Sequence, residues 1–183
     1  MPPAAVLQLL AAAPAVGISG SRTPGPFSLA ALVSLAACVP ASASVLVGDA
    51  SGIDTSAVRY LPRASVFQVG AYGSPHAPFR AQLAARSIAC VQACAAAGGV
   101  WCAFPARPAP AGLAPSARPA VCFGGFGAGT WSSLALALGL GLPAVMFSAL
   151  PPPCGWGLLP AAPGWFVAAP LARPAAPQQL ALF

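Results

Sequence analysis

Short apolar runs alternate along the chain with longer Ala-rich segments in which the larger apolar side chains recur at helical spacing. The runs contain almost no alternating polar positions, which is typical of strands buried on both faces of a sheet. This pattern predicts six strands, over residues 15–19, 44–47, 65–69, 100–104, 120–123 and 144–147. The segments between them predict helices over residues 27–39, 53–60, 78–97 and 128–140.

The order of these elements predicts the fold class. Strands that alternate with helices form parallel sheets, because each return to the same edge of the sheet needs a crossover. We therefore expect an α/β protein with a Rossmann-like open parallel sheet and helices on both faces. The expected domain covers residues 15–150. It follows an N-terminal extension over 1–14 and precedes a Pro-rich C-terminal tail over 151–183 without much regular structure.

The charged residues narrow the possible functions. The chain has eight Arg, two Asp, one His and no Lys, Glu or Asn, which gives a net charge of +6. This composition excludes a phosphate-loop lysine, a Schiff-base lysine, an H-E-x-x-H zinc site and any glutamate base. A surplus made of arginine alone favours bidentate recognition of anions. The arginines are scattered, so an extended nucleic-acid surface is the weaker interpretation.

The high apolar content raises the question of a membrane protein, because hydrophobic residues make up 58% of the chain and charged residues 5%. Residues 131–150 are about long enough for a spanning helix, which needs roughly 20 residues, but Gly-Leu-Pro at 141–143 divides them, so we expect no membrane segment. A signal peptide has a basic residue before its apolar run, and no basic residue precedes the apolar run at 6–10. The six cysteines include no C-x-x-C pair, which predicts reduced thiols that fill the core and no metal site. The alternative is a metal held by Cys90 and Cys94, which share one face of a predicted helix. We expect a cytoplasmic protein.

A glycine-rich loop over residues 124–130 is the strongest candidate for chemistry. It has four glycines in six residues, follows a predicted strand and opens a predicted helix. Glycines let the backbone approach a ligand closely, and the unpaired N–H groups of a helix start attract anions. We expect this loop to hold a phosphate, with Thr130 as a hydroxyl donor. The alternative is a tight turn in which the glycines serve packing alone.

Two further loops bring polar side chains to the same edge of the predicted sheet. Arg22, beside Ser21, has a guanidinium that fits a phosphate, although a surface arginine is the alternative. Asp49 directly follows a strand and suits a ribose hydroxyl. Asp54 lies in the first turn of a helix, where it either contacts the ligand or only complements the helix dipole.

Four motifs occur in a characteristic order: Gly-Ser-Arg at 20–22, Gly-Asp-Ala-Ser-Gly-Ile-Asp at 48–54, Arg-Ser-Ile-Ala at 86–89 and Gly-Phe-Gly-Ala-Gly-Thr-Trp at 125–131. Over about residues 16–147 the chain thereby resembles the SLOG superfamily of Rossmann-like proteins, which includes the DNA-processing protein DprA and the cytokinin-activating LOG enzymes. The resemblance implies a nucleotide or nucleotide-derived ligand across the strand exits. It also implies a phosphate at the glycine-rich loop and a ligand contact from Arg86.

The resemblance leaves open whether the chain is an enzyme. LOG enzymes carry a P-G-G-x-G-T-x-x-E motif whose glutamate serves the phosphoribohydrolase reaction, and Ser133 stands at that place here. A serine hydroxyl cannot replace a carboxylate base. A LOG-like phosphoribohydrolase or other nucleotide hydrolase, using Asp49 or Asp54, is therefore the alternative to a sensing module. Residues 52–54 and 80–86 resemble the DprA branch, so single-stranded DNA binding is a second alternative.

We therefore expect a module that binds or senses a nucleotide-derived ligand, with no cofactor and no assigned catalytic residue. The expected ligand-binding residues are Gly20, Ser21, Arg22, Gly48, Asp49, Gly52, Asp54, Arg86, Gly124, Gly125, Gly127, Gly129 and Thr130. So few charges leave apolar surface, which predicts a homo-oligomer that uses Trp156, Trp165 and the C-terminal tail. The alternative is a compositional bias of the source genome.

Overall fold

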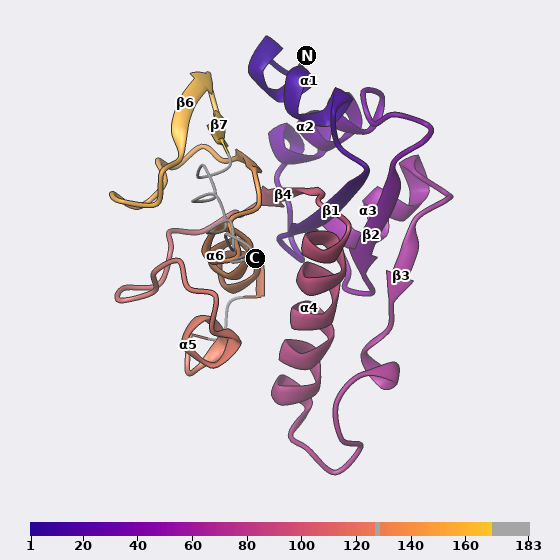
Figure 1. The fold of residues 1–183 in the computed structure, drawn as a ribbon, viewed down its shortest axis with the longest axis vertical. Helices are drawn as coiled ribbons and strands as arrows, with labels where there is room; N and C mark the ends of the chain where they lie inside the picture. The colour runs from indigo at the N-terminus through magenta and orange to yellow at the C-terminus, as the bar shows by residue number, and fades with distance from the viewer. Residues whose placement is uncertain (127–128, 170–183) are drawn as a thin grey trace, which may run out of the picture.

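The computed structural model describes residues 1–126 and 129–169 as a twisted sheet with helices packed against it (Figure 1). Its helices are α1 (Ala4–Ala11), α2 (Pro26–Ala36), α3 (Ile53–Tyr60), α4 (Phe79–Ala96), α5 (Pro119–Phe123) and α6 (Gly129–Gly139), with a short 3-10 helix, η1 (Val69–Ala71). Its strands are β1 (Ala15–Gly20), β2 (Ser44–Gly48), β3 (Ser65–Phe67), β4 (Val100–Phe104), β5 (Ala144–Phe147), β6 (Leu159–Ala162) and β7 (Trp165–Ala168).

The strands form one seven-stranded sheet in the order β3-β2-β1-β4-β5-β7-β6. The five strands from β3 to β5 pair in parallel, whereas β7 and β6 add to β5 in antiparallel fashion. The α/β, Rossmann-like expectation is confirmed, with a mixed sheet around a parallel core. Because β1 has β2 on one side and β4 on the other, the direction of strand addition reverses between β1 and β4. Ligands of open α/β sheets bind outside the carboxyl ends of the strands at such a point.

Helices cover both faces of the sheet, as β4 illustrates. Cys102 and Phe104 of this strand join the apolar cluster with α1, α2 and α3, while Trp101 and Ala103 join the cluster with α4 and α6. All five residues of β4 are buried. Helices α4 and α6 lie side by side (Figure 1). The continuous apolar run at 100–104 is therefore a strand covered on both faces.

One predicted strand is wrong. Residues 120–123 belong to helix α5, which begins with Pro119 at its first turn. Proline has its φ pre-set for a helix start and lacks the N–H that a strand would donate to its neighbour. A run of four apolar residues does not by itself distinguish the two structures. The glycine-rich segment consequently follows a short helix, and the fifth parallel strand is β5.

Both ends of the described chain are part of the fold. Val6 and Leu10 of α1 are fully buried against the sheet. The segment expected to lack regular structure contains the β6–β7 hairpin, whose turn uses Gly164 at φ 77°. Residues 170–183 of the expected tail lie outside the described residues. Among the residues described, no helix has the length and apolar character needed to cross a membrane.

Candidate functional site

A cavity of about 500 Å³ opens at the carboxyl ends of β1, β2 and β4, beside the first turns of α4 and α6. This position coincides with the reversal of strand order between β1 and β4. The cavity is lined by Ile18, Ser19, Gly20, Ser21, Arg22, Thr23, Gly48, Ala50, Asp54, Arg80, Leu83, Arg86, Ser87, Cys90, Trp101, Pro105, Ala106, Arg107, Gly129, Thr130, Trp131 and Ser133.

Arginine is concentrated in this lining, which holds four of the eight arginines of the chain. Arg22, Arg80 and Arg107 are exposed and come from the β1 exit, the start of α4 and the β4 exit, respectively. We refer to these three as the rim arginines. The two aspartates are the only acidic side chains of the sequence, and both contact the fourth arginine, Arg86. No acidic side chain is therefore left to neutralise the rim arginines.

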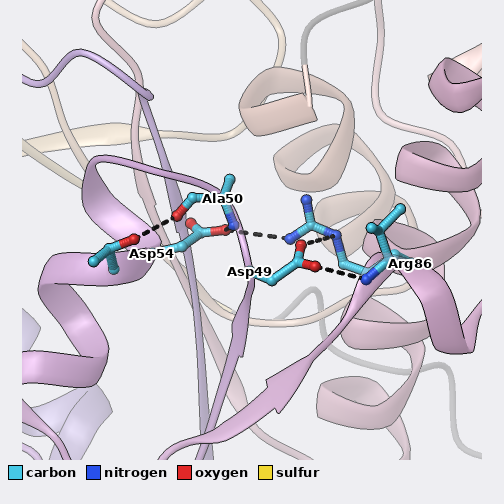
Figure 2. Close-up of polar contacts among 6 residues, drawn as sticks. Asp49, Ala50, Asp54 and Arg86 are labelled. Carbon is cyan, nitrogen blue, oxygen red and sulfur yellow. Dashed lines mark hydrogen bonds and ion pairs between the residues drawn. The ribbon is translucent and has the colours of Figure 1, made fainter.

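Arg86 is 6% exposed. Its guanidinium forms ion pairs with both Asp49, which follows β2, and Asp54, at the start of α3. Its Nη1 lies 3.2 Å from Oδ2 of Asp54, and its Nε lies 3.7 Å from Oδ1 of Asp49 (Figure 2). Asp54 Oδ2 also accepts a hydrogen bond of 3.4 Å from the Ala50 N–H, and Asp49 Oδ2 accepts one of 2.7 Å from the Val69 N–H. This Arg86–Asp49–Asp54 clamp fixes the β2 exit against α3, α4 and η1.

Gly48, the last residue of β2, makes room for the clamp. A Cβ at this position would overlap the Arg86 guanidinium and lie within 2.5 Å of Asp54 Oδ2. The guanidinium therefore lies directly against the backbone at the end of β2. Gly48 was expected to approach a ligand, and its observed neighbour is a side chain of α4.

Burial changes the acidity of Asp54. Loss of solvent raises the pKa of its carboxyl from 3.8 to about 6, although the charge and hydrogen bond of Arg86 act in the opposite direction. Burial also raises the pKa of the Cys90 thiol, so this cavity-lining cysteine is protonated at neutral pH. Burial therefore disfavours a thiolate nucleophile at this position.

Backbone hydrogen bonds fix the loops that carry the rim arginines. The Ser21 N–H donates to Phe104 O over 3.0 Å, and the Ile53 N–H donates to Ser21 O over 3.0 Å. On the other side, Nε1 of Trp131 donates to Arg107 O over 2.8 Å, which ties the β4 exit to the first turn of α6. Arg22 and Arg107 thus project from anchored backbone at the ends of two adjacent strands.

The structure brings most of the expected ligand residues together. Eight of them line the cavity: Gly20, Ser21, Arg22, Gly48, Asp54, Arg86, Gly129 and Thr130. Four do not line it: Asp49, Gly52, Gly124 and Gly125. The Asp49 carboxylate instead accepts a hydrogen bond from the Val69 N–H of η1 and pairs with Arg86. Gly127 lies outside the described residues.

Sequence reasoning did not single out Arg107, Trp101 or Ser19 as ligand residues, although all three line the cavity. Arg107 lies three residues after the end of β4, just as Arg22 lies two residues after the end of β1. An arginine shortly after a strand is therefore the signal that indicates both residues. Trp101 lies within a strand, where an aromatic residue is read as core. Nothing in the sequence distinguishes it from the other buried positions of β4.

Comparisons with known protein families, with curated proteins and with solved structures find no match for this chain. The described residues contain no group of three or more metal-ligating side chains. His76 is exposed and is not among the lining residues. What the arrangement offers chemically is a cationic rim, hydroxyl groups and one carboxylate, that of Asp54.

Proposed function

We propose that the chain binds or senses a nucleotide or nucleotide-derived ligand, and that the cavity at the β1–β4 switch point holds its phosphate. The observation that carries the proposal is the set of three rim arginines, which have no acidic side chain to neutralise them. Arginine forms strong, often bidentate hydrogen bonds with phosphate oxygens.

Two further features support an anion at this position. Gly129 and Thr130 line the cavity at the first turn of α6, an eleven-residue helix whose N-terminus carries a positive partial charge. The volume of about 500 Å³ falls in the range of small-molecule sites. This helix start lines the same cavity as the rim arginines, so both features favour an anion at one place.

Membership of the SLOG superfamily is the finer form of this proposal. Its support is the parallel strand order and the Gly-Ser-Arg and Gly-Asp-Ala-Ser-Gly-Ile-Asp motifs, parts of which line the cavity. The glycine-rich motif gives less support than its sequence suggested, because it follows helix α5 rather than a strand. The proposed activity therefore rests on the arginines and does not depend on the family.

Calorimetry with inorganic pyrophosphate and with adenosine monophosphate tests the proposal. The double variant Arg22→Gln/Arg107→Gln should bind both compounds at least tenfold more weakly, since a charged hydrogen bond contributes about 1.5–3 kcal/mol. The matched control is Arg59→Gln/Arg118→Gln, which removes the same charge from residues outside the cavity lining. Equal weakening in both doubles, or no binding by the unmodified protein, would contradict the proposal.

A nucleotide hydrolase is a second candidate, because Asp54 lines the cavity and has a pKa of about 6. A carboxylate with a pKa near the working pH is suited to general base catalysis. Chromatography of nucleotide incubations would detect free base or released phosphate. Product formation that disappears in Asp54→Asn favours the hydrolase, and binding without any product favours the sensor.

A further inference from the structure

Unpartnered buried polar atoms gather at this cavity. Among the residues described, four buried side-chain polar atoms lack a hydrogen-bond partner: Ser19 Oγ, Arg86 Nε, Trp101 Nε1 and Ser132 Oγ. The first three belong to residues that line the cavity. Leaving a buried polar group unpaired costs about 1–3 kcal/mol, so each such group calls for an explanation. Their concentration at one place points to a partner that enters the cavity.

Trp101 is the most informative of the three. It is 1% exposed, and the Cε3–Cζ3 edge of its ring packs over Gly17 of β1, where a Cβ would overlap it. The indole is thereby held against the sheet, and Nε1 belongs to the opposite edge of the ring. The other indole of the cavity, Trp131, donates to Arg107 O. One indole N–H of the cavity is thus paired, and the other is not.

The cavity also has two chemically different ends. Its rim carries exposed arginines, whereas its buried lining includes Ile18, Cys90 and Trp101. Arg86 Nε already lies 3.7 Å from Asp49 Oδ1 in the clamp, so among the residues described the Trp101 N–H is the buried side-chain N–H group with neither a hydrogen bond nor an ion pair, and it can only donate. A complementary ligand is therefore anionic at one end. At the other end it is apolar, and it carries an acceptor atom. A nucleobase has this character, because it is planar and bears ring-nitrogen or carbonyl acceptors.

We propose that the buried part of the cavity receives the nucleobase of the ligand, with Trp101 Nε1 donating to an acceptor atom of the ring. Trp101 is then a specificity-determining residue of the site. This inference rests on the proposed function, since the rim arginines hold the phosphate that brings the base into the cavity. It adds that the protein recognises the base and not only the anion.

The substitution Trp101→Phe tests the inference, because it removes the N–H and keeps an aromatic ring. Calorimetry would compare inorganic phosphate, ribose 5-phosphate and the four common ribonucleoside monophosphates. In the unmodified protein, at least one monophosphate should bind about tenfold or more tightly than ribose 5-phosphate. Trp101→Phe should lose most of that difference, as expected for one hydrogen bond. It should leave the affinities for ribose 5-phosphate and phosphate unchanged.

Folding of the variant is checked independently by thermal melting without ligand. Trp101→Phe removes an unpaired buried donor, so its melting temperature should stay within a few degrees of that of the unmodified protein. The matched control is Trp156→Phe, a buried tryptophan outside the cavity lining, which should keep the preference for the base.

The outcomes separate this inference from the proposed function. If the unmodified protein binds phosphate but gains nothing from any base, Trp101 does not recognise a base, and the inference is overturned while anion binding stands. If Trp101→Phe weakens ribose 5-phosphate as much as the nucleotides, the residue acts only through the structure of the cavity and the inference also fails. If phosphate and nucleotides do not bind at all, the proposed function falls with it.

Discussion

Arg86 and Asp54 form a buried ion pair, with 3.2 Å between Nη1 and Oδ2 and less than a tenth of either side chain exposed. The two residues are 32 positions apart in the sequence and join α4 to the start of α3. A buried pair contributes little net stability, because desolvation offsets the attraction between its charges. Removal of one partner is costly, since the other then stays buried without compensation.

Substitution Arg86→Met should therefore destabilise the protein by about 3 kcal/mol or more at pH 7, as measured by urea unfolding. The loss should be smaller at pH 5, where the Asp54 carboxyl is mostly protonated and needs no counter-charge. The control Arg118→Met, an exposed arginine, should change the free energy of unfolding by less than about 0.5 kcal/mol. A loss independent of pH would show that packing, and not charge, is the contribution of Arg86.

The raised pKa of Asp54 predicts an unusual pH dependence. Its folded pKa of about 6 lies above the ordinary value of 3.8, so between these values the folded state binds more protons than the unfolded state. The free energy of unfolding should therefore rise as the pH falls from about 7 to about 4, by at most about 3 kcal/mol from this group.

Asp54→Asn should remove this rise, and urea unfolding of both proteins at several pH values measures it. The effect is open to measurement because the sequence has only one other acidic side chain. A parallel pH dependence in the variant and the unmodified protein would assign the titration to another group.

Gly48→Ala should destabilise the clamp, because the added methyl group overlaps the Arg86 guanidinium. We expect a loss of about 2 kcal/mol or more in urea unfolding, within the range that core overpacking produces. The matched control is Gly70→Ala, whose Cβ would meet nothing within 4 Å, so its stability should be unchanged or slightly higher. Similar values for the two alanine variants would mean that Arg86 moves aside without cost.

The β6–β7 hairpin should contribute strongly to stability. Trp165 is buried, and its ring centroid lies 4.9 Å from that of Phe147 on β5. Trp165→Ala should cost about 3–5 kcal/mol in thermal or urea unfolding. Leu159→Ala, on the exposed side of β6, should have little effect. A small loss for Trp165→Ala would mean that the parallel core is stable without its antiparallel extension.

The fold could be predicted from the sequence wherever an element is long or wholly apolar. The predicted bounds 100–104, 144–147 and 53–60 coincide with β4, β5 and α3. The prediction is wrong at residues 120–123, where four apolar residues fit either structure and Pro119 is the signal that favours a helix. The hairpin is hard to predict because β6 contains Pro160, and both strands are only four residues long and lie within a Pro-rich segment.

The site could be predicted only in part, for a physical reason. Position after a strand is visible in the sequence and correctly places Arg22 at the cavity, but it also predicts Asp49, which does not line the cavity; Asp54, in the first turn of a helix, does line it. The clamp is not visible, because Arg86 meets its two aspartates through tertiary packing and through the missing side chain of Gly48. The composition does predict that some arginines have no acidic partner, since two acidic residues cannot neutralise eight arginines.

The two outer strands of the sheet are short and poorly suited to recruit another chain. β3 has three residues, and β6 has four with Pro160 among them and an irregular register against β7. Pairing of either edge strand with a strand of another chain, whether in an oligomer or in a fibril, is therefore disfavoured. Trp156 and Trp165, which were expected to form contacts between copies of the chain, are both buried within it. Designs that fuse a partner strand to either outer strand should couple poorly.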